Sequence, residues 1–414
     1  MASRSLWLDK VTYNGFDWQP STLAAATRIL AAVFGSSTQI GNREPLWDSP
    51  ENCKRNVLRC EVHSNRETVP KTVILKRVAD SQAHYDEKEL QPGTIAWRHS
   101  AEWAACRLLE RLGSKPALSP RCYGGDRTEA LLVLEDLGTG PTVASLLHGH
   151  NVEQAERALL SYAETLGRLH ATTCGREVEY NGIWESLGMP ALTTAREDDL
   201  AHIFEHLVSV RASLTTLGYA FSPAAEEELS SALQSLRDPG AFLALGQGDP
   251  NPVNDLLQGE RVRLYDFEYS GFRHALMDGV FNRHLYPWTR YRLPESMLAQ
   301  MEVRYRGELA RACPEAQDEP HFRLEQLRTR LVWLLVTLRF LLEQTLTPSL
   351  CQRTLILLER FTDDTEMHGC LPAMSAATKE LGALLEARWQ LTAPLLPLYP
   401  AFQLLRSPED ADLG

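Results

Sequence analysis

The pattern of hydrophobic residues changes about one third of the way along the chain. In residues 57–63 (VLRCEVH) apolar and polar side chains alternate, and residues 72–78 (TVILKRV) are rich in β-branched side chains. Both features are typical of strands, and the turn-forming residues between them predict a hairpin. From about residue 153 onward, apolar residues recur at the spacing of amphipathic helices. The sequence therefore predicts an α+β fold, with a small β-rich lobe followed by a larger, mainly helical lobe.

Two further elements complete the expected N-terminal lobe. The stretch SAEWAACRLLERLG has Ser100 at the expected N-cap of a helix, a helical apolar spacing, and Gly113 at its end. The stretch ALLVLEDLG is typical of a buried strand that runs into a turn. We therefore expect the order strand, strand, helix, strand, with the first lobe in residues 1–136 and the helical lobe in residues 137–414.

One loop interrupts the helical part of the chain. In GQGDPNPVNDLL, Pro250 and Pro252 remove two backbone donors and restrict φ. The segment can form neither a helix nor a strand, and it is expected to be a stiff loop that holds Asp249 and Asn254 in fixed directions. A stiff loop with acid and amide side chains is a candidate for catalysis or binding.

A short hairpin is expected directly after this loop. The stretches NDLLQ and RVRLYDFE flank a turn at Gly259, and Asp266 stands at the end of the apolar second strand. Because the loop and the end of that strand meet at the same end of the hairpin, we expect Asp249, Asn254 and Asp266 to converge. Carboxylate and amide oxygens without His or Cys suit a hard cation such as Mg²⁺. An aspartate beside such an ion can orient a substrate hydroxyl and accept its proton, as phosphoryl transfer requires.

The composition is that of a globular protein, and it limits the class of partner. The chain has 414 residues, of which 44% are hydrophobic, and a net charge of −12. This charge argues against a nucleic-acid or membrane partner and favours a neutral or cationic small molecule. None of the eight cysteines forms a C-x-x-C pair, and the strongest apolar stretch is interrupted by Arg339. We therefore expect a cytoplasmic protein with reduced thiols.

The loop and the strand after it resemble a known family. QGDPNPVNDLL followed by RLYDFEYSGFRHALMDG is similar to the catalytic loop and metal-binding strand of the aminoglycoside phosphotransferase and choline kinase-like superfamily. The family pattern is roughly H-G-D-x-x-x-x-N and then D-F/W-E/D, so the GDPNPVND loop indicates an outlying branch. Lys76 in VILKR resembles the family's phosphate-binding lysine, Glu102 in SAEWAACRLL its helix partner, and LLVLEDLG the hinge that meets adenine. The chain departs from the pattern at Gln247, which replaces histidine, and in lacking G-x-G-x-x-G before the first strand.

The resemblance implies a protein-kinase-like two-lobe fold and an ATP-dependent phosphotransferase with an alcohol group as acceptor. The implied cofactors are Mg²⁺ and ATP, with GTP as the alternative nucleotide. The implied roles are catalysis for Asp249, Mg²⁺ binding for Asn254 and Asp266, and nucleotide binding for Lys76, Glu102 and the backbone near Glu135 and Leu137. Asp278 in HALMDG is expected to stabilise the catalytic loop rather than to touch substrate.

Most of these residues also have a purely structural interpretation. Lys76 fits a lysine near the exposed end of an edge strand, and Glu102 fits a first-turn acid favoured by the helix dipole. Asp249 fits a turn former before proline, and Asn254 a cap at the start of a strand. The segment around Glu135 fits a simple connection between lobes.

The expected function is that of a small-molecule kinase acting on a hydroxyl of an amino sugar, an amino alcohol or a related metabolite or antibiotic. The alternative is a catalytically weak, pseudokinase-like module that binds a nucleotide or a partner. The sequence leaves no room for a long activation segment after Asp-Phe-Glu, which argues against a protein substrate. It does not specify the acceptor or the oligomeric state.

Two sets of residues are candidates for contact with the acceptor. Three acidic residues are candidates to attract a cationic acceptor, although acids are expected beside a two-metal centre in any case: Asp255, Glu268 and Asp278. Three aromatic residues are expected either to stack on the acceptor or to pack between helices: Tyr286, Trp288 and Tyr291.

Overall fold

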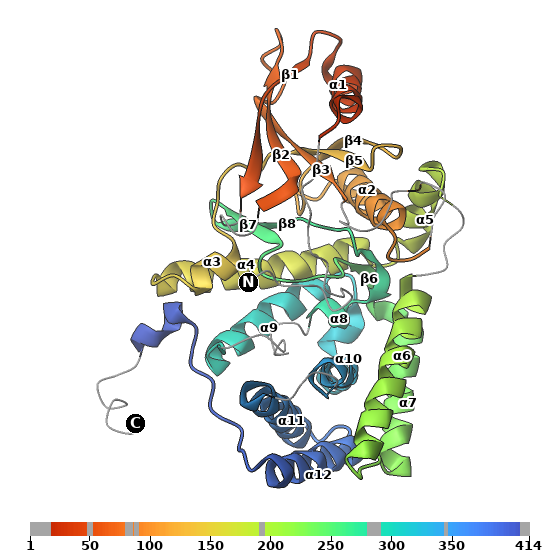
Figure 1. Ribbon diagram of the computed structural model, residues 1–414, viewed down its shortest axis with the longest axis vertical. Helices are drawn as coiled ribbons and strands as arrows, with labels where there is room; N and C mark the ends of the chain where they lie inside the picture. The colour runs from red at the N-terminus through yellow and green to blue at the C-terminus, as the bar shows by residue number, and fades with distance from the viewer. Residues whose placement is uncertain are drawn as a thin grey trace. The chain divides into compact units, whose positions relative to one another are not determined.

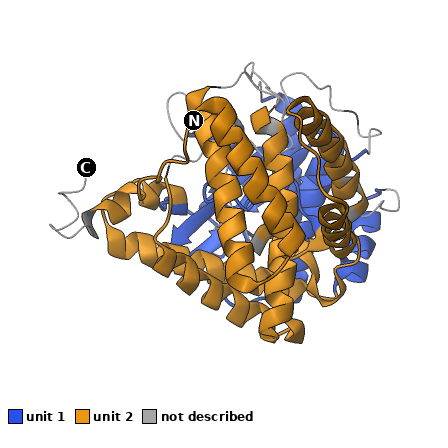
Figure 2. Cartoon of the chain, turned by 90° about the horizontal axis from the view of Figure 1, so that it is seen from below, with its two compact units in different colours: residues 1–143, 176–192, 247–271 blue, residues 144–175, 193–246, 272–414 orange. Residues whose placement is uncertain are grey.

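The chain folds into two compact units, coloured separately in Figure 2. The structure is a computed structural model, and it describes residues 18–47, 53–78, 86, 91–189, 195–279, 291–342 and 347–405. Unit 1 comprises residues 1–143, 176–192 and 247–271, and unit 2 comprises residues 144–175, 193–246 and 272–414. The lobe boundary that we expected between residues 136 and 137 stays a prediction.

Unit 1 is built on a five-stranded antiparallel sheet (Figure 1). Its strands are β1 (Gln39–Trp47), β2 (Cys53–His63), β3 (Thr72–Arg77), β4 (Cys122–Asp126) and β5 (Leu131–Glu135), in the order β1-β2-β3-β5-β4. The expected hairpin is present, since β2 pairs with β3 and Val57 lies opposite Lys76. Because β3 lies between β2 and β5, Lys76 is on an interior strand, and its interpretation as an edge-strand lysine is wrong.

Two helices cover opposite faces of this sheet, α1 (Pro20–Phe34) and α2 (Ile95–Leu112). Val73 and Leu75 of β3 pack in one core cluster with residues of α1, whereas Ile74 packs with residues of α2. This alternation follows from the strand geometry, in which successive side chains point to opposite faces. Lys76 lies two residues after Ile74 and therefore projects toward α2.

The start of α2 differs from the sequence prediction. Its N-cap is Thr94, whose Oγ1 accepts a hydrogen bond from the backbone N–H of Trp97 at 3.4 Å. Ser100 is buried within the helix, and its hydroxyl donates to the carbonyl of Ala96. The prediction that Ser100 caps the helix is therefore wrong, because the polar residues before it lie on buried faces. Gly113 ends the helix in the left-handed conformation, as expected.

The second predicted hairpin is also present and belongs to unit 1. Strands β7 (Asp255–Gln258) and β8 (Arg261–Leu264) pair antiparallel, and Gly259 supplies the positive φ of 65° that the turn requires. Helix α5 (Glu177–Ser186) completes the unit, and its Trp184 ring lies 6.0 Å from the ring of Trp97 on α2.

Unit 2 is mainly helical, as the sequence predicts. Its long helices are α4 (Val152–Thr173), α6 (Ala195–Thr216), α7 (Pro223–Arg237), α9 (Glu295–Leu309), α10 (Glu319–Leu342), α11 (Pro348–His368) and α12 (Pro372–Trp389). Its short helices and strands are α3 (Val143–Leu147), α8 (Leu276–Gly279), β6 (Leu243–Gly246) and β9 (Gly271–His274). The first residues of α3 and β9 are the last residues of unit 1 segments. The described residues also form the 3-10 turns η1 (Gly240–Phe242), η2 (Pro314–Gln317) and η3 (Pro400–Leu405). Helix α10 packs against α6, α7 and α11, and β6 pairs with β9. No helix in the described part of the chain is long and apolar enough to cross a membrane.

Helices α4 and α9 pack closely at a glycine. A Cβ atom on Gly167 of α4 would lie 2.5 Å from the backbone oxygen of Tyr305 on α9. A backbone atom cannot move aside as the end of a flexible side chain can, so this helix pair requires glycine at the crossing.

This crossing generates a stability prediction. Alanine normally stabilises a helix interior relative to glycine by about 0.5–1 kcal/mol, but overpacking costs about 1–3 kcal/mol. We expect Gly167→Ala to lower the free energy of unfolding by about 1–2 kcal/mol, measured by denaturant titration. Gly307→Ala on α9 is the matched control, because a Cβ there meets no atom within 4 Å. If both substitutions change the free energy of unfolding equally, α4 and α9 do not approach each other as closely at Gly167 as the structure shows.

Candidate active site

Lys76 is the centre of a buried cluster of charges in unit 1. Its Nζ donates to Oε2 of Glu102 on α2 at 2.5 Å and also to Oδ1 of Asp266 after β8. The side chain of Lys76 is 11% exposed, and that of Glu102 only 2%. The interpretation of Glu102 as an ordinary first-turn acid is therefore wrong, because it lies in the interior of the helix and pairs with a buried cation.

The balance of charge in this cluster is negative. Burial alone would lower the pKa of Lys76, but Asp266 and Glu102 raise it above its ordinary value, so the lysine remains protonated. Burial also raises the pKa of Glu102 to about 7; Lys76 opposes this shift, whereas Asp266 and Glu268 add to it. Mutual repulsion among the three carboxylates would be relieved by a further cation.

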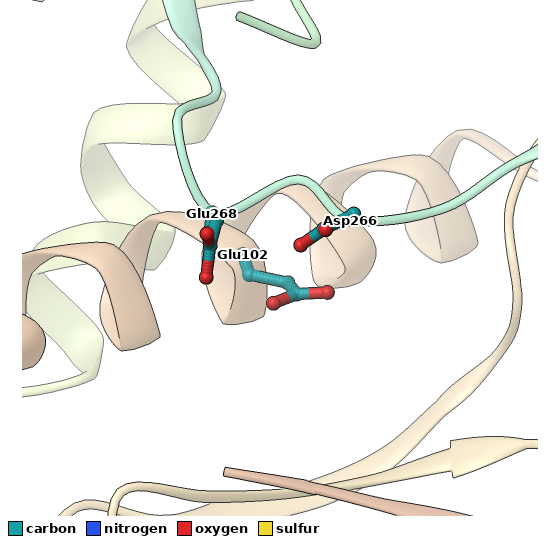
Figure 3. A group of neighbouring side chains, drawn as sticks. All are labelled: Glu102, Asp266 and Glu268. Atoms are coloured by element: carbon teal, nitrogen blue, oxygen red, sulfur yellow. The ribbon is translucent and has the colours of Figure 1, made fainter. Parts of the chain in front are cut away.

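Asp266 joins this cluster through an unusual backbone conformation. Its φ is 65°, in the left-handed region, which costs a residue other than glycine on the order of 1–3 kcal/mol. Figure 3 shows Asp266 and Glu268 on one segment and Glu102 on α2, with their carboxylates gathered beside the helix. One ligand atom from each of the three side chains lies within 4.8 Å of the others. This all-oxygen set fits a hard cation such as Mg²⁺.

The catalytic loop predicted from the sequence is held by its own amide side chain. Nδ2 of Asn254 donates to both the backbone oxygen and Oδ2 of Asp249, each at 3.1 Å. Because the amide nitrogen is the donor in these bonds, Asn254 orients the Asp249 carboxylate, and its amide oxygen is the atom that could bind a cation. Asp249 and Asn254 therefore meet, whereas their expected convergence with Asp266 stays a prediction.

Gln247 connects this loop to the end of β8. Its Nε2 donates to the backbone oxygens of Tyr265 at 2.6 Å and Asn254 at 3.3 Å, and the side chain is fully buried. The backbone N–H of Tyr265 in turn donates to the oxygen of Asn254 at 3.0 Å. Since Tyr265 precedes Asp266, these bonds connect the loop of Asp249 and Asn254 to the segment after β8 that carries Asp266. Gln247 thus supports the loop through two backbone hydrogen bonds, although it departs from the motif that the loop resembles.

Asp255 does not have the role proposed from the sequence. It is fully buried, and its Oδ1 accepts a hydrogen bond from the backbone N–H of Val143 at 2.8 Å. Its Oδ2 has no hydrogen-bond partner among the described residues. Burial raises the pKa of Asp255 well above its ordinary value. The prediction that Asp255 attracts a cationic acceptor is therefore wrong, because the group is shielded from solvent and supports a backbone amide.

The raised pKa of Asp255 predicts a pH-dependent stability. A carboxyl group with a raised pKa holds its proton in the folded protein at pH values where the unfolded chain has lost it, so stability falls as pH rises above the ordinary pKa of 3.8. We expect Asp255→Asn to remove this dependence. Between about pH 4 and about pH 7, the melting temperature of the variant should therefore rise relative to that of the wild type. Asp238→Asn is the matched control, because it makes the same substitution at an exposed aspartate. If the difference in melting temperature between Asp255→Asn and the wild type is the same at every pH, Asp255 is not the titrating group.

The segment predicted to meet adenine connects the large sheet to the hairpin. The Glu135 carboxylate pairs with Arg263 of β8 at 2.7 Å, and the backbone oxygen of Leu137 accepts from Nε2 of Gln258 at 3.1 Å. These contacts lie within unit 1, so the interpretation of this segment as a connection between lobes stays a prediction as well. Adenine binding at Glu135 and Leu137 stays a prediction.

The remaining candidates lie in unit 2. Asp278 is buried, with its Oδ2 3.8 Å from Nε2 of His170. A Cβ on Gly246, directly before the catalytic loop, would lie 3.1 Å from the same Asp278 oxygen, which is consistent with a supporting role. Tyr291 packs against the ring of Tyr399, with 5.3 Å between their centroids. Tyr286 and Trp288 lie outside the described residues.

The sequence analysis missed one residue of the charge cluster, Arg98. Its Nη2 donates to Oε1 of Glu268 at 2.5 Å. The signal was present, because Arg98 precedes Glu102 by four positions and shares its helix face. The prediction that the helix starts at Ser100 left Arg98 outside it.

Comparison with known proteins identifies similar folds only among solved structures. No protein-family model and no curated protein matches the chain. A choline kinase from Streptococcus pneumoniae is 13% identical, with 82% of this chain and 98% of that chain covered and a TM-score of 0.41. A choline/ethanolamine kinase family protein from Mesorhizobium loti is 17% identical, with coverages of 87% and 99% and a TM-score of 0.40. An aminoglycoside phosphotransferase in a ternary complex with streptomycin and ATP is 11% identical, with coverages of 78% and 94% and a TM-score of 0.44.

The solved structures found are those of the superfamily that the sequence motifs resemble. The α+β architecture expected from the sequence is confirmed by the five-stranded sheet and the helical unit. At these identities and TM-scores, the similarity assigns no activity to the chain, so the function rests on the residues of the site.

Proposed function

We propose that the protein is a small-molecule kinase that transfers the γ-phosphoryl group of ATP to a hydroxyl group. The observation that carries this proposal is the buried contact of Lys76 with both Glu102 and Asp266. A buried lysine that already balances two carboxylates is pre-oriented to bind phosphate oxygens without further ordering of its side chain. Lys76 and Arg98 supply two positive charges to a cluster with three carboxylates, which leaves room for a further cation.

The loop residues supply the remaining groups of the proposed reaction. Asp249 would orient the acceptor hydroxyl and take its proton, and Asn254 holds the Asp249 carboxylate in a fixed direction for that purpose. Lys76 would bind the α and β phosphates, with Glu102 fixing its position. Asn254 and Asp266 would hold Mg²⁺, which, when bound, neutralises charge on the phosphates.

The class of acceptor is proposed from the charge of the whole chain. The net charge of −12 favours a neutral or cationic partner, such as an amino alcohol or an amino sugar. ATP is the proposed nucleotide, with GTP as the alternative. The proposal is a soluble cytoplasmic enzyme whose partner is the small-molecule acceptor rather than nucleic acid or a membrane.

Two substitutions test the catalytic assignment. We expect Asp249→Ala to lower kcat about 100- to 10,000-fold with little effect on nucleotide affinity, because Asp249 acts on the acceptor proton. We expect Asp266→Ala to stop transfer and also to weaken Mg²⁺-dependent ATP binding at least about tenfold. Calorimetric titration with ATP, with and without Mg²⁺, and coupled turnover assays would separate the two effects. Asp238→Ala at the exposed end of α7 is the control for an aspartate outside the site.

The alternative function is a pseudokinase-like module that binds a nucleotide or a partner. The same titrations and turnover assays distinguish it from a kinase. Turnover with a panel of aminoglycosides, amino alcohols, sugars and nucleosides would support the kinase. Mg²⁺-dependent ATP binding without turnover on the whole panel would favour the binding module. Unfolding of both the Asp249 and Asp266 variants would show that these residues are structural, and the assignment would fail.

A further inference from the structure

Arg98 is a buried cation beside the candidate metal-binding carboxylates. It lies one turn before Glu102 on α2, and its side chain is 7% exposed. Its guanidinium donates to Oε1 of Glu268 and lies 5.0 Å from the centre of the Tyr269 ring. An arginine stacked on one residue and hydrogen-bonded to its neighbour holds the backbone between them as well as the two side chains.

The pairing of Arg98 with Glu268 should persist when a cation binds. Burial alone would lower the pKa of Arg98, but Glu268 raises it above its ordinary value, so the guanidinium remains charged. Separation of the pair would leave this buried charge without its carboxylate partner, which is unfavourable in a site shielded from water. A carboxylate has two oxygens, so Glu268 can accept from Arg98 with one oxygen and offer the other to a cation.

A second bond connects the same two segments. The hydroxyl of Ser270 donates to the backbone oxygen of Ala101 on α2 at 3.2 Å. Together with the contacts of Arg98, this bond holds residues 268–270 against α2. The position of Glu268 is therefore set by α2, the helix that also carries Glu102.

We infer that Arg98 is a positioning residue of the phosphoryl-transfer site, which holds Glu268 so that its second carboxylate oxygen faces the cation shared with Asp266. This inference rests on the proposed function. Glu268 thereby becomes part of the Mg²⁺ site and is unavailable to attract the acceptor, the role expected from the sequence. The competing interpretation is that Arg98 and Glu268 only fasten α2 to the chain after β8.

Mg²⁺ dependence distinguishes these two roles. ATP binding would be titrated at increasing Mg²⁺ for wild type, Arg98→Met, Arg98→Lys, Glu268→Gln and the double variant Arg98→Met/Glu268→Gln. We expect Arg98→Met to raise the Mg²⁺ concentration for half-maximal ATP binding about 10- to 100-fold, as for other residues that orient metal ligands. Arg98→Lys should restore part of the loss, because lysine keeps the charge but not the planar geometry.

The double variant tests whether Arg98 acts through Glu268. We expect it to require no more Mg²⁺ than Glu268→Gln alone, because Arg98 has nothing left to orient. Arg211→Met is the matched control, since Arg211 forms an exposed pair with Glu226 at 2.6 Å in unit 2. Its Mg²⁺ dependence should equal that of the wild type.

Each outcome bears on a different claim. A lower melting temperature with unchanged Mg²⁺ dependence in Arg98→Met would overturn the inference and leave a structural role. Additive effects in the double variant would also overturn it. If Arg98→Met fails to fold, Arg98→Lys and Glu268→Gln still decide, because normal Mg²⁺ dependence in both would refute it. Wild-type protein that binds no ATP at any Mg²⁺ concentration would instead overturn the proposed function, and this inference with it.

Discussion

The candidate site depends on one buried lysine. Lys76 is held by Glu102 from α2 and by Asp266 from the segment after β8, so three separate parts of the chain meet at its ammonium group. Burying a charge is costly unless it is paired, and each partner here offsets the cost for the others. Removal of Lys76 would leave the two carboxylates facing each other without the cation that they share. The sheet, α2 and the hairpin are therefore coupled through electrostatics as well as through packing.

The loop of Asp249 and Asn254 is organised by neutral groups instead. The amides of Gln247 and Asn254 are the donors, and they bond to backbone oxygens and to the Asp249 carboxylate without a histidine. Such bonds do not change with pH over the range in which histidine titrates. Gln247 thus joins the loop to the segment after β8 through a side chain that does not titrate.

Much of the fold could be predicted because its signals are local. Alternation in residues 57–63, helical spacing after residue 153 and the turn at Gly259 each depend on neighbours in the sequence, and the corresponding hairpins and helices are present. The start of α2 was missed for a related reason. Arg98 is polar but buried, so the apolar pattern placed the helix start too late.

The sequence by itself determined the elements, the stiff loop and the kinds of side chain that the site contains. Only the tertiary structure decided which of them meet, because Lys76 and Asp266 are 190 positions apart and no local pattern encodes their contact. The tertiary structure also gave different surroundings to acidic residues that the sequence alone did not distinguish. Asp255 is buried on a backbone amide, whereas Glu268 is paired with Arg98 in the charge cluster. Burial and pairing set the behaviour of a carboxylate, and both depend on residues distant in the chain.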